Sequence, residues 1–300
     1  MPEKQNRRTA LKSLLAGTAA IGASAMVPAI ASEASENSST VKFKGNINHS
    51  VCQWCYGFMP LEELCKAVKK IGFGAIDLIG PKDWPMLQQY GLFSSMCYHV
   101  GKSSLTNGFN SLAFHEQLIK DYTETIPLMA KAGYKNLICF SGSRNGMDDE
   151  TGLKNCVTGL QKLLPLAEKN GVTIQMELLN SKIDHKDYMC DKTPWGVELC
   201  KRLGSENFKL LYDIYHMQID EGDVIRTIKS SHQYIGHYHT AGVPGRHEID
   251  NKQELYYPAI MQAILDTGYK GYVAQEFIPT GKEIKDKVAA LKQAVKICDV

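Results

Sequence analysis

The sequence has 300 residues, of which 44% are hydrophobic and 22% are charged. These values are typical of a globular protein and exclude a disordered or collagen-like chain. The formal net charge is +2, but residues 1–31 hold four basic residues and one acidic residue, so the remainder carries a net charge of −1. A dedicated nucleic-acid binder usually keeps a basic excess, and we therefore expect no nucleic-acid partner.

Residues 1–31 have the composition of an export signal. The pair Arg7-Arg8 precedes an apolar run rich in Ala and Gly, and the small-residue motif at 29–31 suits a signal peptidase. The arginine pair resembles a twin-arginine signal. We predict a cleavable signal peptide over 1–31, a flexible leader over 32–44, and export to the periplasm. An N-terminal membrane anchor is the alternative, but Gly and Ala disfavour a spanning segment, and we expect no membrane association after cleavage.

From residue 45 onward, short runs rich in β-branched and aromatic residues alternate with longer amphipathic runs. The short runs are continuously apolar, which favours parallel strands buried on both faces by helices. The predicted strands cover 47–51, 74–79, 93–99, 136–140, 172–177, 208–213, 234–239 and 271–276. The predicted helices cover 60–71, 84–90, 113–132, 152–170, 194–203, 223–230, 257–266 and 283–298.

Eight strand–helix pairs are the number that closes into a (β/α)8 TIM barrel, in the α/β class. We predict one such domain over 45–300. A doubly wound open sheet is the alternative, but no glycine-rich phosphate turn follows the first predicted strand.

Four successive predicted strands end in side chains that bind metal ions: Glu177, Asp213, His239 and Glu276. The carboxyl ends of barrel strands converge on one face, where the loops build the active site. Three carboxylates and one imidazole suit a single divalent ion such as Mn, Mg or Co, with Zn also admissible. His237 lies on the same strand as His239, and we prefer His239 because it is nearer the strand end. The alternative is that each acid is satisfied by a nearby lysine or by backbone.

Further polar side chains are expected around the same face. His216 lies three residues beyond Asp213, Arg246 lies on the loop after the seventh strand, and His99 ends the third strand. Arg246 could clamp a carboxylate or hydroxyl. The alternative is a solvated loop residue for Arg246 and a packed core histidine for the other two.

The sequence resembles hydroxypyruvate isomerase, within the xylose-isomerase-like barrel family of sugar isomerases and epimerases. The resemblance is carried by segments 176–180 (MELLN), 211–218 (LYDIYHMQ), 235–248 (IGHYHTAGVPGRHE) and 274–279 (AQEFIP). Hydroxypyruvate isomerases tend to carry Gln at the third metal position, whereas ketose 3-epimerases carry His, as this chain does at His239. The loop around Arg246 is more similar to the isomerases, so the sequence lies between the two branches.

The resemblance implies a metal held by Glu177, Asp213, His239 and Glu276, with Glu177 and Glu276 as the acid–base pair. It further implies that His216 and Arg246 bind the substrate and that Trp54 forms a wall of the pocket. His99 is kept as a further candidate for substrate binding. The implied partner is a small sugar or hydroxy acid, and the expected assembly is a homodimer or homotetramer.

The implied activity is isomerisation of hydroxypyruvate, or of a small ketose or aldose, through an enediolate. Ketose 3-epimerisation on the same site and a non-catalytic exported sugar-binding barrel are the alternatives. Cys52 and Cys55 have the spacing of a redox motif, but the predicted barrel is not a thioredoxin fold. A DNA-repair nuclease would need a larger His-rich cluster and a basic groove, which the charge of the chain disfavours.

Overall fold

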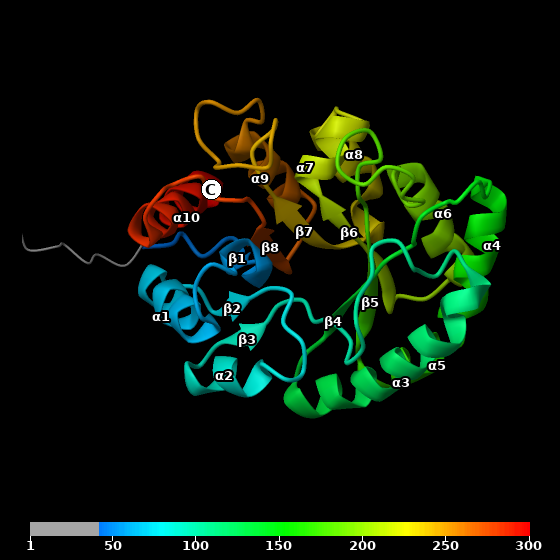
Figure 1. Ribbon diagram of the computed structural model, residues 1–300. Helices are drawn as coiled ribbons and strands as arrows, with labels where there is room; N and C mark the ends of the chain where they lie inside the picture. The colour runs from blue at the N-terminus through cyan, green and yellow to red at the C-terminus, as the bar shows by residue number, and fades with distance from the viewer. Residues whose placement is uncertain (1–41) are drawn as a thin grey trace, which may run out of the picture. The chain divides into compact units, whose positions relative to one another are not determined.

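The computed structural model describes residues 42–300, which form a ring of parallel strands surrounded by helices (Figure 1). The predicted signal peptide and most of the predicted leader lie outside the described residues. The strands are β1 (Asn48–Val51), β2 (Ala75–Ile76), β3 (Phe93–Ser94), β4 (Asn136–Cys139), β5 (Thr173–Glu177), β6 (Phe208–Asp213), β7 (Ile235–Thr240) and β8 (Tyr272–Gln275). Eight parallel strands, each followed by helix, confirm the predicted TIM barrel.

Six of the strands form one continuous parallel sheet in the order β1-β8-β7-β6-β5-β4, and β2 and β3 form a separate parallel pair. Two backbone hydrogen bonds join the pair to the sheet on each side. Asp77 N donates to Val51 O at 2.8 Å and Gln53 N donates to Asp77 O at 3.1 Å. On the other side, Cys97 N donates to Asn136 O at 2.8 Å and Ile138 N donates to Cys97 O at 3.1 Å. These contacts close the ring, so the carboxyl ends of all the strands face the same side.

The helices lie outside the ring, where they cover the apolar outer face of the strands (Figure 1). They are α1 (Leu61–Ile71), α2 (Trp84–Gln89), α3 (His115–Ala132), α4 (Asp149–Leu160), α5 (Leu164–Asn170), α6 (Thr193–Leu203), α7 (Ile214–Asp220), α8 (Val224–Ser231), α9 (Tyr257–Asp266) and α10 (Ile284–Cys298). Helix α1 shows why these segments are helical: its first turn is acidic, its last turn is basic, and Gly72 ends it with a φ of 115°.

Short 3-10 helices at Gln53–Tyr56, Leu112–Phe114 and His232–Tyr234 complete the described elements. Among residues 42–300, no helix combines the length and the apolar character needed to cross a membrane.

Two sequence predictions about the elements are wrong in detail. The single helix predicted over 152–170 is two helices, α4 and α5, because Pro165 lacks the backbone N–H that would continue the ladder and instead starts α5. The second and third strands are much shorter than predicted. Leu78 has a φ of 61°, which turns the backbone out of the sheet directly after β2 and Asp77.

Candidate active site

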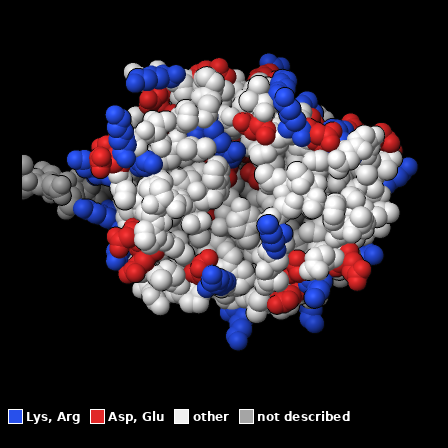
Figure 2. Space-filling view, in the orientation of Figure 1, with Lys and Arg blue, Asp and Glu red and all other residues white. Residues whose placement is uncertain are grey.

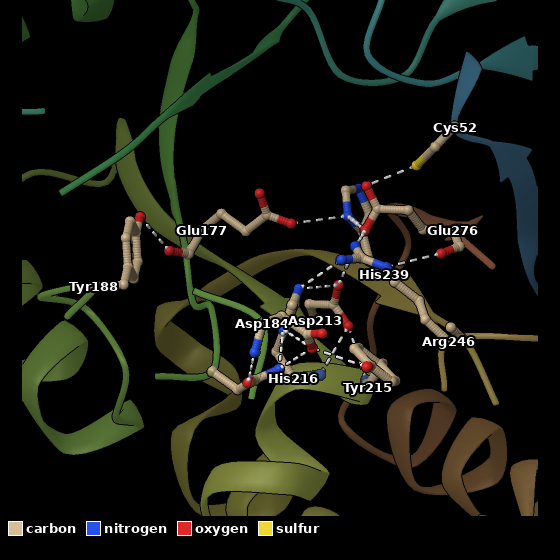
Figure 3. A network of polar contacts seen from close by, with 12 residues as sticks. Cys52, Glu177, Asp184, Tyr188, Asp213, Tyr215, His216, His239, Arg246 and Glu276 are labelled. Atoms are coloured by element: carbon tan, nitrogen blue, oxygen red, sulfur yellow. Dashed lines mark hydrogen bonds and ion pairs between the residues drawn. The ribbon is translucent and has the colours of Figure 1, made fainter. Parts of the chain in front are cut away.

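The four residues predicted at strand ends lie together at the carboxyl face of the barrel (Figure 3). Each of Glu177, Asp213, His239 and Glu276 offers one ligand atom, and these atoms all lie within 4.8 Å of one another. All four side chains are buried. The barrel register brings them together, since Asp213 of β6 pairs directly with His239 of β7 and β7 pairs with β8.

The two ring nitrogens of His239 contact different carboxylates. One nitrogen faces the glutamates of the cluster, and the other contacts an aspartate beneath the cluster. Nδ1 lies 2.8 Å from Glu276 Oε2 and 3.2 Å from Glu177 Oε1. Nε2 lies 3.1 Å from Asp77 Oδ1. Sequence reasoning missed Asp77. The available signal was its position as an acid inside an otherwise apolar strand, where a buried charge needs a partner.

Asp213 serves both the cluster and the local fold. Its Oδ1 accepts hydrogen bonds from the backbone of Tyr215 and His216, which caps the short helix α7. Its Oδ2 faces Arg246 Nη2 at 3.3 Å. The helix was not predicted from the sequence, although an Asp at a strand end followed by apolar residues is the signal of such a cap.

Arg246 reaches over the cluster from the loop after β7. Its Nη2 lies 2.5 Å from Glu276 Oε2, and its Nη1 donates to His216 Nε2 at 2.9 Å. The guanidinium also lies over the Trp54 ring, 5.1 Å from its centroid. Arg246 has a φ of 59°, a left-handed conformation that non-glycine residues rarely adopt and that is concentrated at functional sites.

His216 is neutral in this arrangement. An arginine only donates hydrogen bonds, so Nε2 of His216 must be the acceptor and carry no proton. Burial, and then the charge of Arg246, lower the pKa of His216 well below its usual value. The side chain is fully buried behind Arg246, and it orients the guanidinium rather than lining the pocket.

A cavity of about 330 Å³ opens above the cluster. In the space-filling view it is a hollow near the middle of this face, with acidic and basic atoms at its floor (Figure 2). Its floor holds Glu177, Glu276 and Arg246, and its walls are largely apolar: Trp54, Leu78, Tyr98, Leu105, Phe140 and Leu179, with Ser103 and His185 as further polar residues. Apolar walls with a few convergent polar groups are typical of a small-molecule site.

Two further predicted site residues differ in their placement. Trp54 lies on the pocket rim, and its Nε1 donates to Glu276 Oε1 at 2.7 Å. His99 is not among the lining residues. It lies one layer behind them, where Nε2 is 3.2 Å from the hydroxyl of Ser103 and Nδ1 accepts from Gly101 N at 3.1 Å.

The surroundings shift the pKa values of Glu177 and Glu276 in opposite directions. Burial, reinforced by the nearby charge of Glu276, raises the pKa of Glu177. Burial acts in the same direction on Glu276, but the charges of His239 and Arg246 outweigh it and hold the pKa of Glu276 well below its usual range. Two carboxyl groups with separated acidities in one pocket are the arrangement used for acid–base chemistry.

The C-x-x-C cysteines do not have the environment of a redox pair. Both thiols are buried and unbridged, and burial raises the pKa of Cys52 and of Cys55 well above the usual value. A reactive cysteine needs a lowered pKa and access to solvent. Cys52 Sγ instead lies 3.7 Å from both Asp77 Oδ1 and His239 Nε2, below the pocket floor.

The cluster fits a divalent cation. Asp77 accepts from Nε2 of His239, so Nδ1 is the nitrogen that faces Glu177 and Glu276. Without an ion, burial lowers the pKa of His239, but the charges of Cys52 and Glu276 and the contact with Asp77 outweigh it and raise the pKa well above its usual value, so Nδ1 carries a proton that the carboxylates accept. A divalent cation would take the place of that proton among the same atoms. Three carboxylates and one imidazole nitrogen are a donor set for Mn, Mg, Co or Zn.

Comparison with known proteins is consistent with this geometry. A family model described as xylose isomerase-like TIM barrel matches residues 65–294. A 2-oxo-tetronate isomerase from Cupriavidus necator is 39% identical over 113 residues, which are 38% of this chain and 43% of that protein. A putative hydroxypyruvate isomerase from Homo sapiens is 33% identical over 110 residues, which are 37% of this chain and 40% of that protein. These matches span less than half the length of both relatives.

Among solved structures, AP endonuclease, family 2, from Brucella melitensis superposes with a TM-score of 0.73 at 21% identity, covering 83% of this chain and 98% of that one. Identity this low shows a common fold and nothing about activity. The family model, by contrast, covers most of the chain, including all four residues of the cluster. The chain belongs to the xylose isomerase-like TIM-barrel family.

Proposed function

We propose that this chain is a metal-dependent isomerase of hydroxypyruvate or of a small ketose or aldose, acting through an enediolate. The observation that carries the proposal is that Glu177 and Glu276 both approach Nδ1 of His239 at the pocket floor, at 3.2 Å and 2.8 Å (Figure 3). The names of the relatives, a 2-oxo-tetronate isomerase and a putative hydroxypyruvate isomerase, support the same reaction class.

The chemistry follows from what isomerisation requires. Moving a carbonyl to the neighbouring carbon means removing a proton from that carbon and returning a proton to the other. Glu276, which is held ionised, is suited to accept a proton, and Glu177, with its raised pKa, is suited to hold one. A positioned general base or acid contributes ~10²–10⁴-fold in rate. A divalent cation, when bound, supplies Lewis-acid stabilisation of negative charge on the substrate oxygens.

Arg246 indicates how the substrate is oriented. Four of its five N–H groups are engaged: Nε with Glu276 O, Nη1 with His216, and Nη2 with Asp213 and Glu276. Among residues 42–300 the fifth N–H, on Nη1, has no partner, which leaves it for the substrate. A single donor matches one hydroxyl or carbonyl oxygen, whereas a carboxylate would need two parallel donors for a bidentate contact. Trp54 beside it offers an apolar face to the substrate's carbon chain.

Epimerisation at carbon 3 of a ketose is a second candidate, because the same two carboxylates can remove and return a proton at one carbon from opposite faces. His239, where the resembling hydroxypyruvate isomerases tend to carry Gln, favours this reading. The two reactions differ in product, so one assay separates them.

The test is turnover by metal-loaded protein on hydroxypyruvate, 2-oxo-tetronate and four- to six-carbon ketoses, with products identified by NMR. Carbonyl migration that is lost on chelation and in Glu177→Gln supports the isomerase. Inversion without migration assigns the epimerase instead. Binding of a sugar without turnover would refute both and leave a sugar-binding barrel.

A further inference from the structure

Asp77 is a buried carboxylate beneath the pocket floor, directly after β2, and it does not line the cavity. Each of its oxygens contacts two groups. Oδ1 lies 3.1 Å from His239 Nε2 and 3.7 Å from Cys52 Sγ. Oδ2 lies 2.7 Å from Ser95 Oγ and 2.8 Å from His237 Nε2. A carboxylate with this many contacts is held in one orientation.

The contact between Asp77 and His239 decides which nitrogen of the imidazole carries a proton. An ionised carboxylate only accepts hydrogen bonds, so Nε2 must donate to Asp77. In the neutral ring Nδ1 is then unprotonated, and Nδ1 is the nitrogen that lies 2.8 Å from Glu276 and 3.2 Å from Glu177. When His239 is neutral, as a metal-binding histidine must be, its lone pair therefore points into the cluster.

The other contacts of Asp77 keep its Oδ1 aimed at His239. Ser95 donates to Oδ2, and its hydroxyl is in turn 2.6 Å from that of Ser50. His237 is two residues before His239 and therefore on the same side of β7, and its Nε2 lies 2.8 Å from Oδ2 without the alignment of a hydrogen bond. The carboxylate is thus anchored from Cys52 after β1, from Ser95 after β3, and from the two histidines of β7.

We propose that Asp77 is a positioning residue for the metal centre: it fixes the proton of His239 on Nε2 and so presents Nδ1 as a ligand atom beside Glu177, Asp213 and Glu276. The inference rests on the cation-binding part of the proposed function. Carboxylates that orient metal-binding histidines in this way raise metal affinity by ~10–100-fold.

A second metal site is the competing interpretation of these contacts, and the binding experiment below distinguishes it from the proposal. Cys52, Asp77 and His239 bring ligand atoms within 4.8 Å of one another. If these three held a second ion, Nε2 would be a ligand atom and could not carry the proton that the proposal requires.

The experiment measures binding of Mn²⁺ and Zn²⁺ by competition with a chelator in the full-length protein, with wild type compared with Asp77→Asn. The uncharged amide can also donate to Nε2, which favours the wrong tautomer. Asp299→Asn is the matched control, because Asp299 is likewise a buried carboxylate beside a buried histidine, His49, at 3.5 Å, outside the cluster. We expect affinity to fall ~10–100-fold in Asp77→Asn and to stay unchanged in Asp299→Asn.

A second measurement uses only the wild-type protein and so does not depend on whether Asp77→Asn folds. Nitrogen-15 NMR of Zn²⁺-loaded wild type should show His239 with a proton on Nε2, and a proton on Nδ1 would overturn the proposal. Wild-type affinity in folded Asp77→Asn would also overturn it, while leaving the metal site intact. Two bound ions in wild type and one in the variant would make Asp77 a ligand instead. No binding to wild type would overturn the metal centre itself.

Discussion

We expect Glu177→Gln and Glu276→Gln to lower kcat/KM by similar factors but to change the free energy of unfolding differently. In the metal-free protein, where His239 is protonated on both nitrogens, the Glu276 carboxylate accepts hydrogen bonds from Trp54 Nε1 at 2.7 Å, His239 Nδ1 at 2.8 Å and Arg246 Nη2 at 2.5 Å. Within residues 42–300, the Glu177 carboxylate has a single such contact, with His239 at 3.2 Å. Both changes keep the side-chain shape and remove the negative charge.

The difference can be estimated from these contacts. A hydrogen bond to a charged group contributes about 1.5–3 kcal/mol, and Gln retains only part of the three made by Glu276. We expect Glu276→Gln to lower the free energy of unfolding of metal-free protein by about 2–4 kcal/mol. Glu177→Gln loses one weak contact and removes a charge that repels Glu276, so its stability should stay equal or rise by about 1 kcal/mol. Each variant should lose ~10²–10⁴-fold in kcat/KM, equivalent to about 3–5 kcal/mol.

The assay is urea unfolding of chelator-treated proteins, alongside kcat/KM of the metal-loaded proteins on the best substrate of the panel. Equal destabilisation by the two variants would refute the contact-based reasoning. A folded Glu276→Gln protein with near-wild-type turnover would refute the proposed role of Glu276 in proton transfer.

Two further predictions concern stability away from the cluster. Burial lowers the pKa of His99, and Gly101 N donates to its Nδ1, so the folded state holds it neutral. Its contribution to stability is present above the unfolded pKa of 6.5 and is lost as the pH falls from there toward the folded pKa. His99→Gln should therefore flatten the loss of unfolding free energy between about pH 7 and 5, and an unchanged slope would contradict this assignment. Gly108→Ala places a Cβ into the backbone of Gly142 and should cost about 1–3 kcal/mol, whereas Gly74→Ala, with its nearest atom 3.9 Å away, serves as the tolerant control in thermal unfolding.

The strand ends were the most predictable part of the site. Parallel strands buried on both faces are continuous apolar runs, so a charged residue that closes such a run stands out in the sequence. Barrel topology then brings consecutive strand ends together, which is why Glu177, Asp213, His239 and Glu276 could be grouped without coordinates.

The contacts beneath and behind the cluster could not be predicted in the same way. Asp77 and His239 are 162 residues apart, and only the closed ring brings them into contact. His216 was expected at the pocket mouth, but the cap that Asp213 gives to α7 turns it behind Arg246. The early end of β2 depends on the left-handed conformation of Leu78. That conformation could not be predicted, because leucine in an apolar run normally favours an extended backbone.

The ionisable cluster and most of the apolar pocket wall stand on different parts of the barrel. Glu177, Asp213 and His239 stand on β5, β6 and β7, and Glu276 directly follows β8, all four strands being part of the continuous sheet. Four of the six apolar wall residues, Trp54, Leu78, Tyr98 and Leu105, instead follow β1, β2 and β3. Few backbone contacts tie β2 and β3 to the rest of the ring. Substitutions at Leu78, Tyr98 and Leu105, unlike those at Trp54 or Asp77, can therefore reshape the space above the carboxylates without displacing them. On this plan, the space for the substrate can change while the carboxylates proposed to move the proton stay in place.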